Sequence, residues 1–165
     1  MKIERTWAMP NKWTFTIKPI KELLEEEMEG SWADPFAGMH SPADMTNDLN
    51  PLMNAIHHKD ALDFLKELQN ASYDGVLFDP PYSPRQLKEC YDEIGQSLHD
   101  TKSSVWSNWK DEVSRVVKPG GKVISFGWNS MGMGLNRGFT IERILIVPHG
   151  GMHNDTIVTV EVKNE

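Results

Sequence analysis

The feature that most constrains this chain is an apolar run that ends abruptly, in the sequence YDGVLFDPPY at 73–82. A short, nearly continuous apolar run is typical of a strand that is covered on both faces of a sheet. Pro80 and Pro81 end that strand, because each ring fixes φ and removes a backbone N–H donor. We therefore expect a buried strand whose carboxyl end is a rigid loop.

Helical and extended patterns alternate along the rest of the chain. Apolar spacing and Pro or Gly end signals predict helices at 18–30, 60–70, 83–95 and 104–118. Extended segments are predicted at 31–34, 43–51, 73–79, 122–128, 138–148 and 155–163, with the last two antiparallel. This alternation implies right-handed crossovers and an α/β fold, a mostly parallel sheet with helices on both faces. We find no linker and no repeat, and we predict a single domain over 1–165.

Polar loops follow three of the predicted strands, at Asp34–Gly38, Asp79–Tyr82 and Trp128–Ser130. Parallel strands end at the same edge of a sheet, and ligands bind there in open α/β folds. We expect these three loops to meet and to form one binding site.

The chemistry of the Asp79–Tyr82 loop suits a planar amine. The Asp79 carboxylate and the Pro80 carbonyl are acceptors on a rigid rim, and Tyr82 adds a flat face beside them. Two acceptors that bind both hydrogens of a nucleobase amine favour a pyramidal nitrogen, whose lone pair can attack a methyl group. Tyr82 can stack on the base. The alternative is a tight loop in which Asp79 only caps the next helix.

Composition excludes several other classes of protein. The net charge of −7 argues against coating nucleic acid by bulk charge, and no apolar run is long enough to cross a membrane. With one cysteine, Cys90, and no apolar leader, we expect a cytoplasmic protein. We expect Cys90 in the core, the acidic run at 22–29 on a solvated helix face, and His149 and His153 in a structural turn with no metal.

Several segments together carry a resemblance to a known family. DPPY after a strand resembles the signature of amino-group methyltransferases that use S-adenosylmethionine, above all the N6-adenine DNA methyltransferases. DPFAG at 34–38, NDLNP at 47–51, DALDFL at 60–65, VVKPGGKVISFGWNS at 116–130 and FTIKPIKELL at 15–24 are similar to other segments of that family. The resemblance covers roughly 14–162 and looks closest to small adenine-methylase-like proteins of phage and prophage genomes. It implies a Rossmann-like sheet of six parallel strands and one antiparallel strand.

The resemblance also implies roles for individual residues. Asp79, Pro80, Pro81 and Tyr82 would be catalytic. The cofactor S-adenosylmethionine would be held by Asp34, Pro35, Phe36, Ala37, Gly38, Asp48, Asp60 and Lys18. Within this set the loop amides at 36–38 would bind the tail carboxylate, Asp34 the tail ammonium and Asp48 the ribose. Asp60 would accept from the cofactor's adenine amine or serve only as a helix N-cap, and Lys18 would belong to the closing segment or only to a helix start.

Two departures from the family pattern shape the expected site. Only nine residues, 39–47, separate Gly38 from Asp48, which predicts a short loop where a helix is usual. No segment is large enough for a separate target-recognition region. We therefore expect nucleic-acid contacts from three loops or helix starts, namely Lys12, Arg85 with Lys88, and Arg137 in a mobile loop. Specificity could also come from a homodimer or from a separate subunit.

The leading hypothesis is methyl transfer to N6 of adenine in DNA. Adenine in RNA and N4 of cytosine in DNA are alternative targets of the same chemistry. A different kind of alternative is a degenerate methylase that binds nucleic acid or a partner subunit without turnover.

Overall fold

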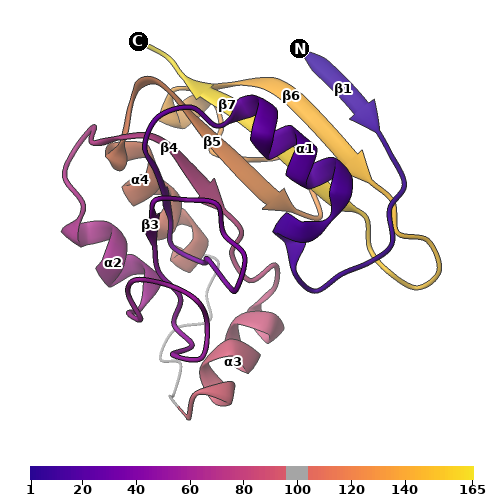
Figure 1. Ribbon diagram of the computed structural model, residues 1–165. Helices are drawn as coiled ribbons and strands as arrows, with labels where there is room; N and C mark the ends of the chain where they lie inside the picture. The colour runs from indigo at the N-terminus through magenta and orange to yellow at the C-terminus, as the bar shows by residue number, and fades with distance from the viewer. Residues whose placement is uncertain (96–103) are drawn as a thin grey trace.

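The computed structural model describes residues 1–95 and 104–165, which form a seven-stranded sheet with helices on both faces (Figure 1). The strands are β1 (Lys2–Arg5), β2 (Trp32–Asp34), β3 (Met45–Thr46), β4 (Tyr73–Phe78), β5 (Val117–Gly127), β6 (Phe139–Val147) and β7 (Thr156–Lys163). The helices are α1 (Lys18–Glu27), α2 (Ala61–Glu67), α3 (Pro84–Glu93) and α4 (Ser104–Val116), with 3₁₀ turns η1 (Thr14–Thr16) and η2 (Leu135–Arg137). Within these described ranges, no helix has the length and apolarity needed to cross a membrane.

The sheet has the order β1-β6-β7-β5-β4-β2-β3. Strand β7 is antiparallel to β5 and β6, and every other neighbouring pair is parallel. Asn47, the residue after β3, forms an isolated parallel bridge with His57. The predicted architecture, mostly parallel with one antiparallel strand, is confirmed.

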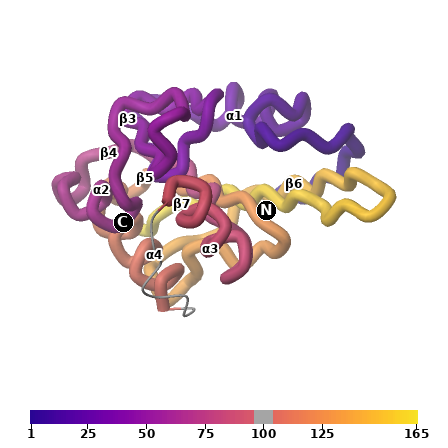
Figure 2. Tube along the Cα trace, turned by 90° about the horizontal axis from the view of Figure 1, so that it is seen from below, coloured from indigo at the N-terminus to yellow at the C-terminus, as the bar shows by residue number. Residues whose placement is uncertain are grey.

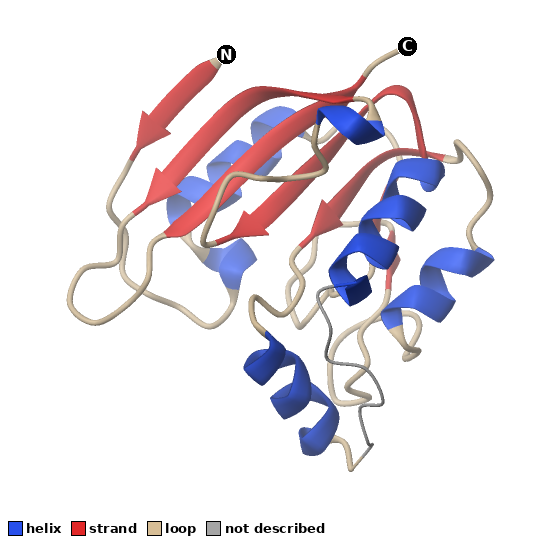
Figure 3. Cartoon of the chain, turned by 180° about the vertical axis from the view of Figure 1, so that it is seen from behind, coloured by secondary structure: helices blue, strands red, loops and turns tan. Residues whose placement is uncertain are grey.

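The sheet separates two apolar clusters, one on each of its faces. Helix α1 buries Ile20, Leu23 and Leu24 over one face, where Leu77 of β4 points. Val76 on the same strand points to the opposite face, which α2 and α4 cover. Figure 3 shows α2 and α4 in front of the sheet and α1 behind it, with α3 below the ends of the strands. A strand with apolar neighbours on both faces explains why 75–78 reads as a continuous apolar run.

Three strands differ from the sequence prediction. Strand β3 covers only Met45–Thr46 of the extended segment expected at 43–51. Strand β5 begins at Val117, although we expected the helix to run through residue 118 and to stop at Pro119. Tyr73 pairs with Val117 and Gly75 pairs with Lys122, so Pro119 and the two glycines after it bulge out of the ladder. Because Pro119 lies in this bulge, the ladder between β4 and β5 does not require the backbone N–H that proline lacks. Strand β1 was not predicted, because four largely polar residues at an edge carry no apolar period.

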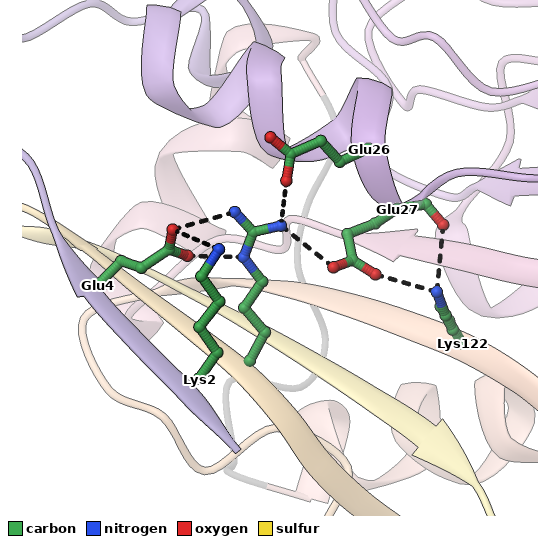
Figure 4. A network of polar contacts seen from close by, with 6 residues as sticks. Lys2, Glu4, Glu26, Glu27 and Lys122 are labelled. Carbon is green, nitrogen blue, oxygen red and sulfur yellow. Dashed lines mark hydrogen bonds and ion pairs between the residues drawn. The ribbon is translucent and has the colours of Figure 1, made fainter.

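A buried arginine attaches β1 and α1 to the sheet (Figure 4). Arg143 of β6 donates to Glu4 of β1 at 2.7 Å and to Glu26 and Glu27 of α1 at 2.7 and 3.1 Å. Lys122 binds the other oxygen of Glu27 at 2.9 Å. The expectation of a solvated acidic helix face is therefore wrong at Glu27, whose side chain is 18% exposed, and holds at Glu26, which is 60% exposed despite its bond to Arg143. Their partner is 116 or more residues away in sequence, which local patterns cannot show.

The loop between β5 and β6 is bonded to β7 at its centre, and the mobility expected of this loop stays a prediction. Glu161 of β7 is fully buried, and its carboxylate accepts from Met133 N at 2.7 Å and Gly134 N at 3.0 Å. A Cβ at Gly132 would lie 2.2 Å from the same carboxylate, and the backbone there has φ +54°. Glycine is therefore required for the loop to close over Glu161.

Candidate active site

The three loops meet at the carboxyl edge of the sheet and surround a pocket of about 900 Å³. Phe36, Ala37 and Gly38, the residues from Asp79 to Tyr82, and Trp128 all line it, and we call the Asp79–Tyr82 part its floor. The volume is at the upper end of the range for small-molecule sites, which leaves room for a large cofactor and a second planar ligand. The convergence predicted from the sequence is confirmed.

At the floor of the pocket, the side chain of Tyr82 is turned onto Asp79. The phenol Oη donates to Asp79 Oδ1 at 2.7 Å, and the ring meets Trp128 edge-on at 5.4 Å between centroids. Burial raises the pKa of Asp79 to about 6, although bonds from Tyr82 and Thr14 act in the opposite direction. Burial also raises the pKa of Tyr82 well above its ordinary value, so the phenol remains a donor.

The backbone of this loop is held from both sides. Tyr82 N donates to the side chain of Gln86 at 2.7 Å, and the Pro81 carbonyl accepts from Trp106 Nε1 at 2.8 Å. The N-cap of α3 is Ser83, whose hydroxyl accepts from Gln86 N. Asp79 is therefore not the helix cap, and its carboxylate is left facing Tyr82 and the pocket.

The loop after β2 uses its amides internally. Phe36 N donates to Asp34 Oδ1, Ala37 N to the Asn47 carbonyl and Gly38 N to Asp48 Oδ2, each at 2.9 Å. These bonds satisfy the donors that were expected to bind the cofactor's tail carboxylate. Through residues 35–44 the chain forms turns and no helix, so the expected short loop is confirmed.

Asp34 lies beneath the pocket rather than in its wall. Its side chain is fully buried and also accepts from Ser41 Oγ at 2.6 Å. Burial, with smaller repulsion from Asp79 and Asp48, raises the pKa of Asp34 to about 7. The residue therefore organises the loop, and this position does not favour a direct contact with the cofactor's ammonium.

Asp48 is the carboxylate that lines the pocket beside Gly38. Its oxygens accept from Gly38 N and Asn50 N at 2.9 Å. An ionised carboxylate has about four acceptor positions, so two remain for a ligand. Asp48 therefore ties the loop together and still offers acceptors to a pair of hydroxyls.

Asp60 and Lys18 lie outside the wall of the pocket. Asp60 is the N-cap of α2, since Oδ1 accepts from Leu62 N at 3.0 Å, and Oδ2 accepts from the Tyr91 hydroxyl of α3. Of its two expected roles, the structure supports the cap. Lys18 begins α1 and is exposed, whereas Trp13, Thr14 and Phe15, just before it, line the pocket. That Trp13 lines the pocket was not predicted, because a single tryptophan in an irregular segment has no pattern.

The four basic residues expected at nucleic acid lie in different places. Lys12 lines the pocket, and its Nζ lies over the ring of Trp13, 4.7 Å from the ring centroid. Arg85 and Lys88 are on the exposed side of α3, and Arg85 pairs with Glu89 at 3.0 Å. Arg137 is tied to α4 by Asp111 at 2.8 Å and Ser107 at 2.9 Å, with a mostly buried side chain. These bonds give Arg137 a structural role in place of the expected contact.

Two other expectations concern single residues. Cys90 is exposed on α3 at the pocket, so the prediction that it lies in the core is wrong. His149 is buried between the Ala8 carbonyl at 2.9 Å and Thr156 Oγ1 at 2.8 Å, as expected for a structural turn. In the part of the chain that the structure describes, no group of three or more potential ligands could hold a metal ion.

Solved structures share this fold, although no protein-family model and no curated protein matches the sequence. TrmN from Thermus thermophilus aligns at TM-score 0.55 and 16% identity, over 88% of this chain and 47% of that chain. The 1,6-didemethyltoxoflavin-N1-methyltransferase of Burkholderia thailandensis, solved with S-adenosylhomocysteine, aligns at 0.57 and 13%, over 89% and 76%. N-methyltransferase NodS from Bradyrhizobium japonicum aligns at 0.55 and 12%, over 90% and 93%.

These likenesses establish the class of fold. The chain has the Rossmann-like fold of S-adenosylmethionine-dependent methyltransferases, and it spans about half the length of TrmN. The candidate active site lies at the carboxyl ends of its parallel strands, where such α/β folds bind their ligands.

Proposed function

We propose that this chain is an S-adenosylmethionine-dependent methyltransferase whose target is the N6 amine of adenine in DNA. The observation that carries the proposal is the Asp79–Tyr82 loop. It holds a carboxylate, a proline carbonyl and an aromatic ring together at the floor of a pocket of about 900 Å³. Such a floor matches the two N–H bonds and the flat face of a nucleobase amine.

The charge around the pocket supports the binding of a cation such as S-adenosylmethionine. Asp34, Asp48 and Asp79 are close enough that the last two raise the pKa of the first. A sulfonium cofactor would relieve this repulsion. Asp48 would accept from its ribose hydroxyls, and Phe36, Ala37 and Gly38 would border it. The internally bonded loop amides leave the tail carboxylate to donors elsewhere in the pocket.

The residues of the loop would divide the catalytic work. When bound, S-adenosylmethionine supplies the methyl group, and the electron pair of the broken C–S bond stays on sulfur. Asp79 and the Pro80 carbonyl would accept both hydrogens of the adenine amine, which frees the nitrogen lone pair for attack. Positive charge then grows on that nitrogen, and the Asp79 carboxylate stabilises it and takes the released proton. Tyr82 would stack on the base.

A second candidate function is a nucleic-acid-binding or partner subunit without turnover. It is favoured by one observation, that the amides of Phe36, Ala37 and Gly38 are already satisfied within the protein. Adenine in RNA and N4 of cytosine in DNA remain alternative substrates of the enzyme, because their amines offer the same two hydrogens.

The first experiment is calorimetric titration with S-adenosylmethionine, followed by incubation with adenine-containing DNA and mass analysis of the nucleosides. We expect binding and N6-methyladenine. Binding without any methylated nucleoside in DNA or RNA would favour the subunit. Absence of binding in the folded protein would reject the methyltransferase proposal.

A further inference from the structure

The mouth of the pocket has unlike charge on its two sides. Residues 10–13, 149 and 152–154 line one side. We call the two segments to which they belong, residues 5–13 and residues 148–154 in the turn between β6 and β7, the cationic rim. The rim contains Arg5, Lys12 and two histidines, and the exposed Asp155 follows directly at the end of the same turn. Helix α3, on the other side, has two basic residues and three acidic ones, Glu89, Asp92 and Glu93.

The two segments of the cationic rim are joined by backbone bonds. Thr6 N continues the β1–β6 ladder by donating to the Ile146 carbonyl at 3.0 Å, and Ala8 N donates to the Pro148 carbonyl at 3.1 Å. His149 Nδ1 donates to the Ala8 carbonyl at 2.9 Å. Figure 2 shows the indigo N-terminal segment and the yellow β6–β7 turn together on one side of the molecule. The rim is therefore a fixed surface, and both segments continue into the pocket wall.

The cationic rim also exposes large apolar side chains. Trp7 is 59% exposed and lies beside Gly150, while Met9 and Met152 are more exposed still. Exposed apolar groups gathered beside cations mark an interaction surface rather than random surface composition. Surfaces that bind single-stranded nucleic acid combine these two elements, cations for the phosphates and aromatic rings for unpaired bases.

We propose that the cationic rim binds single-stranded nucleic acid, with Arg5 and Lys12 on phosphates and Trp7 stacked on a base that neighbours the base in the pocket. The proposal rests on the proposed function, since it names the form of that site's substrate. A duplex would offer its phosphates but no free base face to Trp7. Helix α3, with three acidic and two basic residues, carries a net charge of −1 and therefore attracts the phosphates less than the rim does.

The test is fluorescence anisotropy with a short labelled single-stranded DNA of mixed sequence and with its duplex, at pH 8 and without cofactor. We expect the single strand to bind more tightly. Trp7→Leu should weaken its binding roughly 5- to 150-fold, the loss for one base–aromatic stack, while Trp7→Phe should lose much less. Leucine keeps the apolar surface, so the comparison isolates stacking from burial.

Salt dependence tests the phosphate contacts separately. Two cations on a single strand predict a slope of log affinity against log salt of about −1.4, and Lys12→Ala should reduce it to about −0.7. Lys21→Ala, the same change at an exposed site on α1, is the matched control and should leave the slope unchanged. An unchanged slope in Lys12→Ala would overturn the assignment of Lys12.

Three further results would overturn the proposal. These are duplex binding at least as tight as single-strand binding, equal affinities for Trp7→Leu and Trp7→Phe, and self-association of the protein that Trp7→Leu abolishes. Calorimetry with S-adenosylmethionine on the same samples separates the two levels of inference. Cofactor binding without strand binding would reject only the rim, and strand binding without cofactor binding would reject only the methyltransferase.

Discussion

The hydroxyl of Tyr82 donates a 2.7 Å hydrogen bond to Asp79 Oδ1, so the proposed acceptor is capped by a donor from its own loop. An ionised carboxylate has about four acceptor positions, so Asp79 can still accept from a target amine while it holds this bond. The same bond lowers the pKa of Asp79, against the larger opposite effect of burial. Tyr82 therefore has two separable effects. Its ring would stack on the target base, and its hydroxyl lowers the pKa of Asp79.

Tyr82→Phe should separate these two effects. The ring remains, so methyl transfer at pH 8 should stay within a few-fold of the parent protein. The lost hydrogen bond raises the pKa of Asp79, which should move the rising limb of the pH–rate profile to higher pH. Tyr82→Ala should instead lose the stack, at a cost of about 1–3 kcal/mol in transition-state stabilisation. An unshifted profile for Tyr82→Phe would contradict the role of the hydroxyl.

The pH dependence of kcat/KM should report Asp79 itself. The carboxyl must be ionised to accept from the amine, and its pKa is raised to about 6, mainly by burial. Activity should therefore rise with pH through a midpoint near 6 and then level off. Asp79→Ala should abolish transfer while calorimetric cofactor binding survives. Turnover that persists in this variant would remove Asp79 from the site.

Asp48→Ala should weaken binding of S-adenosylmethionine by about 1–3 kcal/mol, the cost of a lost charge-assisted hydrogen bond. The alanine variant also loses the bonds to Gly38 N and Asn50 N, so the loop itself would loosen. Asp48→Asn is the sharper variant, because its amide oxygen can keep one of these bonds while the charge is lost. Calorimetric affinity equal to that of the parent in both variants would exclude a role at the ribose.

Asp34 should make stability depend on pH. Its folded pKa of about 7 lies above the ordinary value of 3.8, chiefly because of burial. The folded state holds the proton more tightly, so its stabilising contribution is complete below about pH 4 and is lost as pH rises to 7. The loss is on the order of a few kcal/mol. Urea unfolding of Asp34→Asn should show a weaker decline over this window, and an identical decline would assign it to other groups.

Glu161→Gln should destabilise the fold without touching the pocket. The carboxylate accepts from Met133 N and Gly134 N, whereas glutamine would turn an NH₂ toward one of these donors. A buried donor without an acceptor costs about 1–3 kcal/mol in the free energy of unfolding. Glu165→Gln, the same change at an exposed position, should have no measurable effect in the same urea titration.

Much of the fold and the floor of the site could be predicted from the sequence. The apolar run at 75–78, the prolines after Asp79 and the Pro or Gly ends of the helices are local signals, because φ restriction and apolar period act over a few residues. They placed the helices, most strands and the convergence of three loops. For Asp60 the sequence left two roles open, a helix N-cap and a contact with the cofactor. A capping bond can be predicted from neighbouring residues, whereas a ligand contact depends on the tertiary structure.

Only the tertiary structure decided which polar groups find partners within the protein. The burial of Asp34, the loop amides bonded to Asn47 and Asp48, and Arg137 tied to α4 all depend on segments that meet across the fold. The same holds for Glu161 beneath the β5–β6 loop and for the joining of residues 5–13 to the turn at 148–154. Sequence patterns show which residues can bond. The packing of distant segments decides which bonds form and which groups are left for a ligand.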